Sequence, residues 1–216
     1  MAWAYDLRAH RYRDDETGRF LSQARARELI GESLRAAGDA GDELARLMAG
    51  GRMSPDDWRQ RMREEIKGEV IRQYLLGRGG REQMTARDWG SVGGIISDQY
   101  RHLDRKAGNF FSLVEAGELE EGEIARRTRM YLNSAREGHE RALLRRLTGS
   151  EYGEERWVTT AEESCDDCID LALLGWVEIG TLPTRPGAGD TACLTNCACF
   201  VSYRNPDDGL VFGEDE

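Results

Sequence analysis

The sequence predicts a mainly α protein, with an elongated helical bundle followed by a small C-terminal β-rich module. Before residue 150, apolar residues recur every four positions over long stretches, as they do along one face of an α-helix. After residue 150, short β-prone segments alternate with turn residues, and all five cysteines lie there. The hydrophobic content of 39% suits helices with one buried stripe but is low for a large buried parallel sheet.

Charge divides the chain at the same place. Of the 216 residues, those after position 150 include 15 acidic side chains but three arginines, a net charge of −12. Those up to position 150 include 25 acidic and 27 basic side chains, a net charge of +2. We therefore expect four segments, which are an N-terminal arm (1–21), a helical domain (22–150), a cysteine-rich module (151–206) and an acidic tail (207–216).

Targeting and membrane segments are not expected from this sequence. No apolar run approaches the ~20 residues that a membrane span needs. The first twenty residues are charged where a secretory signal would be apolar. The sequence thus predicts a soluble intracellular protein without membrane contact.

The first helices are predicted from their capping residues. Ser22 caps a short helix running to about Ala37, and we expect the sequence GDAGDE that follows to break or restart it. Ser54 with Pro55 and Asp57 forms a clear second start. That helix has one apolar face and ends at the glycines of GRGG (77–80); the face consists of Trp58, Met62, Ile66, Val70 and Tyr74.

Two further long helices are expected before residue 150. Thr85 and Asp88 repeat the capping pattern, and a long apolar stripe then predicts a helix over residues 86–116. An acidic turn precedes another stripe, which predicts a helix from Ile124 to Leu147. In the last module, residues 156–160, 175–182 and 197–204 are predicted strands, 169–174 a short helix and 183–191 a loop.

The cysteines follow the pattern C-x2-C, 24 residues, then C-x3-C-x-C. Two such groups can supply four thiolates to a tetrahedral Zn²⁺ ion. A module of this size with little apolar content usually needs a metal or disulfides to fold. In a reducing compartment zinc is favoured over disulfides, with free thiols as a third alternative.

The predicted zinc ligands are Cys165, Cys168, Cys193 and Cys197. Cys199 is an alternative ligand, because Cys197 and Cys199 would lie on one face if residues 197–203 formed a strand. Four thiolates close the coordination sphere, so the Zn²⁺ would be structural. The predicted fold class is thus an elongated helical bundle with a small C-terminal β-rich zinc-binding module.

Taken together, the motif W-x-T, C-x-x-C, LP, PG-x-G and C-L-T-N-C-x-C resembles the C-terminal module of phage head morphogenesis proteins. These are minor head proteins typified by the F protein of Mu-like phages. The matching residues are Trp157, Thr159, Cys165, Cys168, Leu182, Pro183, Pro186, Gly187, Cys193, Asn196, Cys197 and Cys199. That family often has a His-Pro-x-Cys-Arg-Cys run, whereas here Cys193 stands near the expected histidine and Ala198 replaces the arginine. Stretches 12–22, 77–94 and 129–142 also look like phage proteins of this kind.

The resemblance implies a non-enzymatic virion protein of the phage head or portal region, present in the host cytoplasm during assembly. Its implied partners are portal or capsid proteins, and a homo-oligomer fits the same role. A zinc-dependent nucleic-acid-binding protein is the alternative, motivated by arginines between residues 126 and 146. The acidic module opposes DNA contact, and an enzyme would need a nucleophile–base pair, which no motif supplies.

Overall fold

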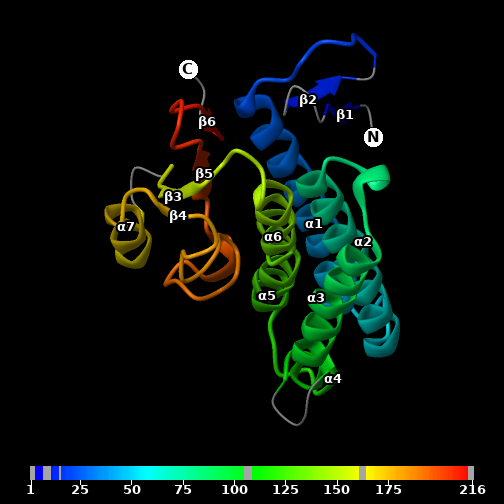
Figure 1. The fold of residues 1–216 in the computed structure, drawn as a ribbon. Coiled ribbons are helices and arrows are strands. Elements are labelled where there is room, and N and C mark those ends of the chain that lie inside the picture. The colour runs from blue at the N-terminus through cyan, green and yellow to red at the C-terminus, as the bar shows by residue number, and fades with distance from the viewer. Residues whose placement is uncertain (1–2, 7–10, 15, 105–108, 161–163, 214–216) are drawn as a thin grey trace.

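The structure is a computed structural model that describes residues 3–6, 11–14, 16–104, 109–160 and 164–213. Its helices are α1 (Gln23–Ala49), α2 (Pro55–Arg78), α3 (Ala86–Asp104), α4 (Phe110–Glu115), α5 (Glu121–Asn133), α6 (Ala135–Leu147) and α7 (Asp166–Leu173). Its strands are β1 (Trp3–Asp6), β2 (Arg11–Asp14), β3 (Glu154–Val158), β4 (Val177–Glu178), β5 (Phe200–Arg204) and β6 (Val211–Phe212). Figure 1 shows the bundle on one side, the small sheet beside α6, and α7 at the outer edge. No helix in the described residues is both long and apolar enough to cross a membrane.

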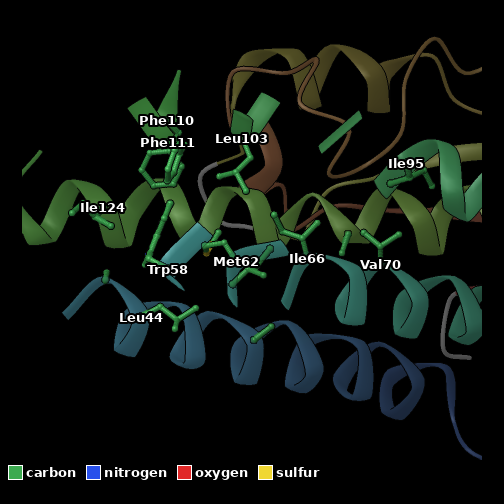
Figure 2. Close-up of a cluster of buried hydrophobic side chains, with 14 of the residues drawn as sticks. Leu44, Trp58, Met62, Ile66, Val70, Ile95, Leu103, Phe110, Phe111 and Ile124 are labelled. Atoms are coloured by element: carbon green, nitrogen blue, oxygen red, sulfur yellow. The ribbon is translucent and has the colours of Figure 1, made fainter. Parts of the chain in front are cut away.

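Helix α2 forms the centre of the bundle. It packs against α1, α3, α5 and α6. The predicted apolar face is confirmed, because every member from Trp58 to Tyr74 is fully buried. Figure 2 shows Trp58 next to Phe110, and these two rings meet edge to face with centroids 5.2 Å apart. Burial of this stripe, rather than helix propensity, holds the bundle together.

The predicted capping residues act as expected. The hydroxyl of Ser54 accepts a hydrogen bond from the Asp57 N–H at 3.1 Å. Gly79 ends α2 in a left-handed conformation with φ of 87°, which favours glycine. At the start of α3, Thr85 and Asp88 bond reciprocally, each side chain accepting from the other residue's N–H. These local patterns determine where the helices begin and end.

The expected break at residues 38–43 is wrong, because α1 is continuous across them. Here the glycines allow close packing instead of ending the helix. A Cβ at Gly41 would lie 2.6 Å from Thr128 and 2.9 Å from Leu132, both on α5. At Gly38 the nearest side chain is Arg129, again on α5. The small residues thus let α1 and α5 approach closely.

Two predicted long helices are each divided. Within residues 86–116, α3 ends at Asp104 and α4 begins after Asn109, whose side chain accepts from the Ser112 N–H at 2.7 Å. Residues 105–108 lie outside the described chain. The helix expected over 124–147 is interrupted at Ser134, where the hydroxyl bonds the Tyr131 carbonyl at 2.6 Å. Side chains that bond the backbone locally compete with helix continuation.

The C-terminal module contains an antiparallel sheet with the strand order β4-β3-β5-β6. Strand β3 pairs with β5 over five residues, from Glu154 opposite Arg204 to Val158 opposite Phe200. The reading of 207–216 as a tail misses β6, which pairs with β5 and buries Phe212. Two residues are too few to give a periodic pattern, so the strand depends on its partner.

The module shares its hydrophobic core with the bundle. Leu143 and Leu147 of α6 belong to the same buried cluster as Trp157, Val201 and Tyr203 of the sheet. Helix α6 therefore has two buried sides, one toward α2 and one toward the sheet. The relative position of the two parts is fixed by apolar contact, not by a linker alone.

The predicted N-terminal arm, residues 1–21, contains a β-hairpin in its described part. Strands β1 and β2 pair antiparallel, and Tyr12 is buried. The Tyr12 hydroxyl donates to the Leu76 carbonyl at the end of α2, and Arg146 donates to that hydroxyl at 3.2 Å. The hairpin is thereby attached to both α2 and α6.

Helices α2 and α6 approach each other closely at Gly77, so a substitution there tests their packing. A Cβ at this position would lie 2.3 Å from the His139 carbonyl oxygen and 2.8 Å from the Ala142 Cβ. Gly77→Ala must separate the two helices, so we expect it to lower the free energy of unfolding by about 1–3 kcal/mol. Urea unfolding followed by far-UV circular dichroism measures this change.

Gly68 in the same helix gives a matched control. A Cβ there meets nothing within 4 Å, and the residue is exposed. Gly68→Ala is expected to stabilise the protein by about 0.5–1 kcal/mol, because alanine restricts the unfolded chain more than glycine does. Similar effects of the two substitutions would contradict the close helix contact.

Candidate metal centre

Two segments of the module bring the five cysteines together. Cys165 precedes α7 directly, and Cys168 lies in the first turn of that helix. Cys193 and Cys197 flank a short 3₁₀ turn, Leu194–Asn196, and Cys199 lies immediately before β5. Leu194 adopts a φ of 53°, in a region that residues other than glycine rarely occupy. The sulfurs of Cys193 and Cys197, one at each end of this turn, both lie close to the sulfur of Cys168.

Cys168 lies at the centre of the sulfur cluster. Its Sγ is 3.7 Å from the Sγ of Cys193 and 3.7 Å from that of Cys197. Sulfurs about 2.3 Å from a tetrahedral zinc ion are separated by roughly 3.8 Å, so both spacings fit the edge of such a site. Cys168 belongs to two groups of three cysteines, and within each group the three sulfurs lie within 4.8 Å of one another. One group adds Cys165 and Cys193, and the other adds Cys197 and Cys199.

Backbone N–H groups point toward some of these sulfurs. The N–H groups of Cys168 and Cys193 lower the pKa of the Cys165 thiol, so this thiol gives up its proton more readily. Burial raises the pKa of Cys197 to about 12, although the Cys199 N–H opposes that change. Burial also raises the pKa of Cys168. A metal ion that binds these buried thiols must displace protons, so its affinity rises with pH.

The four predicted ligands all belong to the cluster, and so does the alternative residue. The structure groups Cys165 with Cys168 and Cys193, while Cys197 stands with Cys168 and Cys199. The expected strand over 197–203 begins only at Phe200, so strand alternation does not account for the shared orientation of Cys197 and Cys199. None of the five forms a disulfide in the structure. Thiolates in this number and spacing fit a soft or borderline metal ion.

Contacts around the cluster hold its two halves together. The Asp167 carboxylate accepts from the Ala192 N–H at 2.7 Å, which ties α7 to the segment before Cys193. The Thr191 hydroxyl lies 3.2 Å from the Cys193 sulfur. The acidic pair Asp166–Asp167 is exposed, whereas residues 162 and 163 lie outside the described chain.

Arg136 of α6 is the neighbour of the cluster that sequence reasoning missed. Its Nη1 donates to the Cys197 carbonyl at 2.6 Å, and its Nη2 donates to the carbonyls of Cys199 at 2.6 Å and Ala198 at 3.3 Å. The sequence indicates a mixed-charge solvated helix for the surrounding arginines. Nothing local marks Arg136 as different, because its partners follow more than sixty residues later.

A buried ion pair supports the loop that joins the two cysteine groups. Glu155 of β3 is fully buried and receives both Nη atoms of Arg185, at 2.8 and 2.9 Å. The Leu182 N–H also donates to this carboxylate at 2.9 Å. The loop is thus attached to the central strand by charge-assisted hydrogen bonds, which are stronger than neutral ones.

Neither of the two histidines in the described residues joins the centre. His139 is buried in α6, with Nδ1 3.2 Å from a carboxylate oxygen of Glu140. His102 is exposed on α3, and His10 lies outside the described residues. Within the part of the chain that the structure describes, the grouped donors of the cluster are the five sulfurs.

Comparisons with protein-family models, with curated proteins and with solved structures gave no match.

Proposed function

We propose that this chain is a non-enzymatic structural protein of a phage virion, acting in the head or portal region with a structural Zn²⁺ ion. The observation that carries the proposal is the position of the motif residues around the sulfur cluster. Cys168, Cys197 and Cys199 are buried in this module, and so are four other residues of the motif, Trp157, Leu182, Pro186 and Gly187. Part of the motif that resembles the phage head family thus contributes to the interior of this module.

Zinc is the proposed ion because its chemistry suits the donors. Thiolates bind Zn²⁺ in closed tetrahedral sites, and such a site stabilises a fold without offering a position for water. We propose Cys165, Cys168, Cys193 and Cys197 as the ligands, with Cys199 as a buried neighbour. The proposal assigns no catalytic residue, and function then lies in the surfaces that the module and bundle display to portal, capsid or identical subunits.

The alternative, a zinc-dependent nucleic-acid-binding protein, receives little support from the arginines of α5 and α6. Most of these side chains are engaged within the protein. Arg126 and Arg127 bond Glu123, Arg129 bonds Asp42, and Arg145 bonds the buried Asp88. Phosphate binding requires cations that are free to replace counterions, so these pairs disfavour a DNA contact.

Mass spectrometry of purified particles tests the proposed role. We expect the protein in proheads or virions of the phage that encodes it, at low copy relative to the major capsid protein. Particles assembled with Cys168→Ser in place of the normal chain are expected to lack it, because the unfolded module cannot dock. Absence of the unmodified protein from both proheads and virions would refute the assignment. Salt-dependent DNA binding that Arg126→Gln and Arg127→Gln weaken would favour the alternative.

A further inference from the structure

We propose that Arg136 is a positioning residue for the metal centre and that it couples the metal-bound state of the module to helix α6. This inference rests on the metal ion of the proposed function and adds the residue through which the bundle acts on it. A single guanidinium bonds the carbonyls of three consecutive residues, Cys197, Ala198 and Cys199. Two of those residues are cysteines of the cluster.

The peptide unit between Ala198 and Cys199 links the guanidinium to sulfur. Its carbonyl accepts from Arg136 at 3.3 Å, while its N–H donates toward the Cys197 sulfur. Because a peptide carbonyl and its N–H point in opposite directions, fixing one fixes the other. Arg136 thereby orients an N–H group toward a sulfur that would bear negative charge when bound to the metal, and hydrogen bonds around a site tune its metal affinity.

Arg136 is itself held by the loop between the two cysteine groups. Gly187 has a φ of 83°, and a Cβ built there would lie 3.1 Å from the Arg136 Cβ and 3.3 Å from the Glu137 nitrogen. Nearby, the Asn133 side chain donates to the Asn196 side chain at 2.7 Å, just before Cys197. The start of α6 is thus enclosed by the same segments that supply the sulfurs.

Charge and shape explain why arginine suits this position. A Zn²⁺ ion with four thiolates carries a net charge of −2, and the residues after position 150 add a net charge of −12. A guanidinium offsets that charge and reaches two carbonyls at 2.6 Å with its two Nη atoms. A lysine ammonium is a point charge without this planar fork, so it replaces the arginine only in part.

Competition with a chromophoric chelator measures the zinc affinity of the full chain and its variants. We expect Arg136→Gln to weaken zinc binding by about 10–100-fold, the range typical of residues that support metal ligands. The zinc affinity of Arg136→Lys should lie between those of the unmodified chain and Arg136→Gln. Arg126→Gln is the matched control. It removes an exposed arginine that pairs with Glu123 in α5, and it should leave zinc affinity unchanged.

Hydrogen exchange gives a second readout that does not depend on affinity. In the unmodified chain, chelation of zinc should increase amide exchange in the first turns of α6. In Arg136→Lys this increase in exchange should be smaller, because the link to the carbonyls is weakened. This variant keeps the positive charge, and it can be used in place of Arg136→Gln if Arg136→Gln does not fold. The Co²⁺-loaded protein should also show shifted thiolate-to-metal bands in either variant.

The outcomes separate this inference from the proposed function. If the unmodified chain binds no stoichiometric zinc, the metal centre and the role of Arg136 both fail. If the chain binds zinc, and Arg136→Gln folds and binds it with unchanged affinity, the role of Arg136 alone is refuted. Unchanged α6 exchange on chelation would likewise overturn the coupling while leaving the metal centre in place.

Discussion

Cys168→Ser is expected to unfold the C-terminal module while the helical bundle stays folded. Cys168 belongs to both sulfur groups, so its loss disrupts either possible ligand set. Structural zinc sites contribute roughly 10–16 kcal/mol in small metal-dependent domains, as much as the whole stability of many proteins. The bundle has its own buried cluster, which extends from Ala37 to Ala142 and includes no residue of the sheet.

Near-UV circular dichroism and metal analysis check this expectation. Trp157 is buried in β3, and Trp176 packs against Arg156 and Arg204, so both report on the module. Their signals should collapse with Cys168→Ser or after chelation, whereas most far-UV helical signal persists. Cys199→Ser is the matched control, because Cys199 is not among the proposed ligands. The Cys199→Ser protein should still bind one zinc ion per chain. An intact near-UV spectrum in metal-free protein would contradict the dependence on metal.

The second large effect is expected at Glu155. Glu155→Gln leaves Arg185 buried without its counterion, and breaking a buried pair from one side costs about 3–5 kcal/mol. Chemical unfolding of the zinc-loaded protein, followed by tryptophan fluorescence, measures the loss. Combining Glu155→Gln with Arg185→Met removes the stranded charge and should recover part of the stability.

Glu154 provides the control for this prediction. It is the preceding residue of the same strand and pairs with Arg204, but both side chains are partly exposed, at 28% and 33%. Glu154→Gln is therefore expected to cost less than about 1 kcal/mol, as exposed pairs do. Equal effects at Glu154 and Glu155 would show that burial of the Arg185 pair does not matter.

Local signals account for the parts of the fold that the sequence predicts well. The caps at Ser54 and Thr85 involve residues three positions apart, and the apolar face of α2 repeats every four residues. Such patterns need no knowledge of the tertiary structure. The convergence of the two cysteine groups is a contact over more than 20 residues, and it is predicted from the ligand chemistry of zinc and not from a local pattern.

The errors arise where a residue's role depends on a distant partner. Gly41 looks like a helix breaker in sequence, yet it accommodates Thr128 and Leu132 of α5 within a continuous helix. Arg136 resembles its neighbouring arginines until the cysteine segment folds onto it. Strand β6 exists because Tyr203 and Arg204 offer it an edge. None of these partners can be identified from the surrounding sequence alone.

The shared core at α6 has a mechanical consequence. Leu143 and Leu147 pack into the sheet cluster, while Gly77 of α2 meets a neighbouring side of the same helix, at His139 and Ala142. A force applied at α7 is therefore transmitted to α2 through packed side chains and not through a flexible linker. Torque between the bundle and the sheet is therefore expected to be resisted by this shared core instead of being absorbed at a hinge.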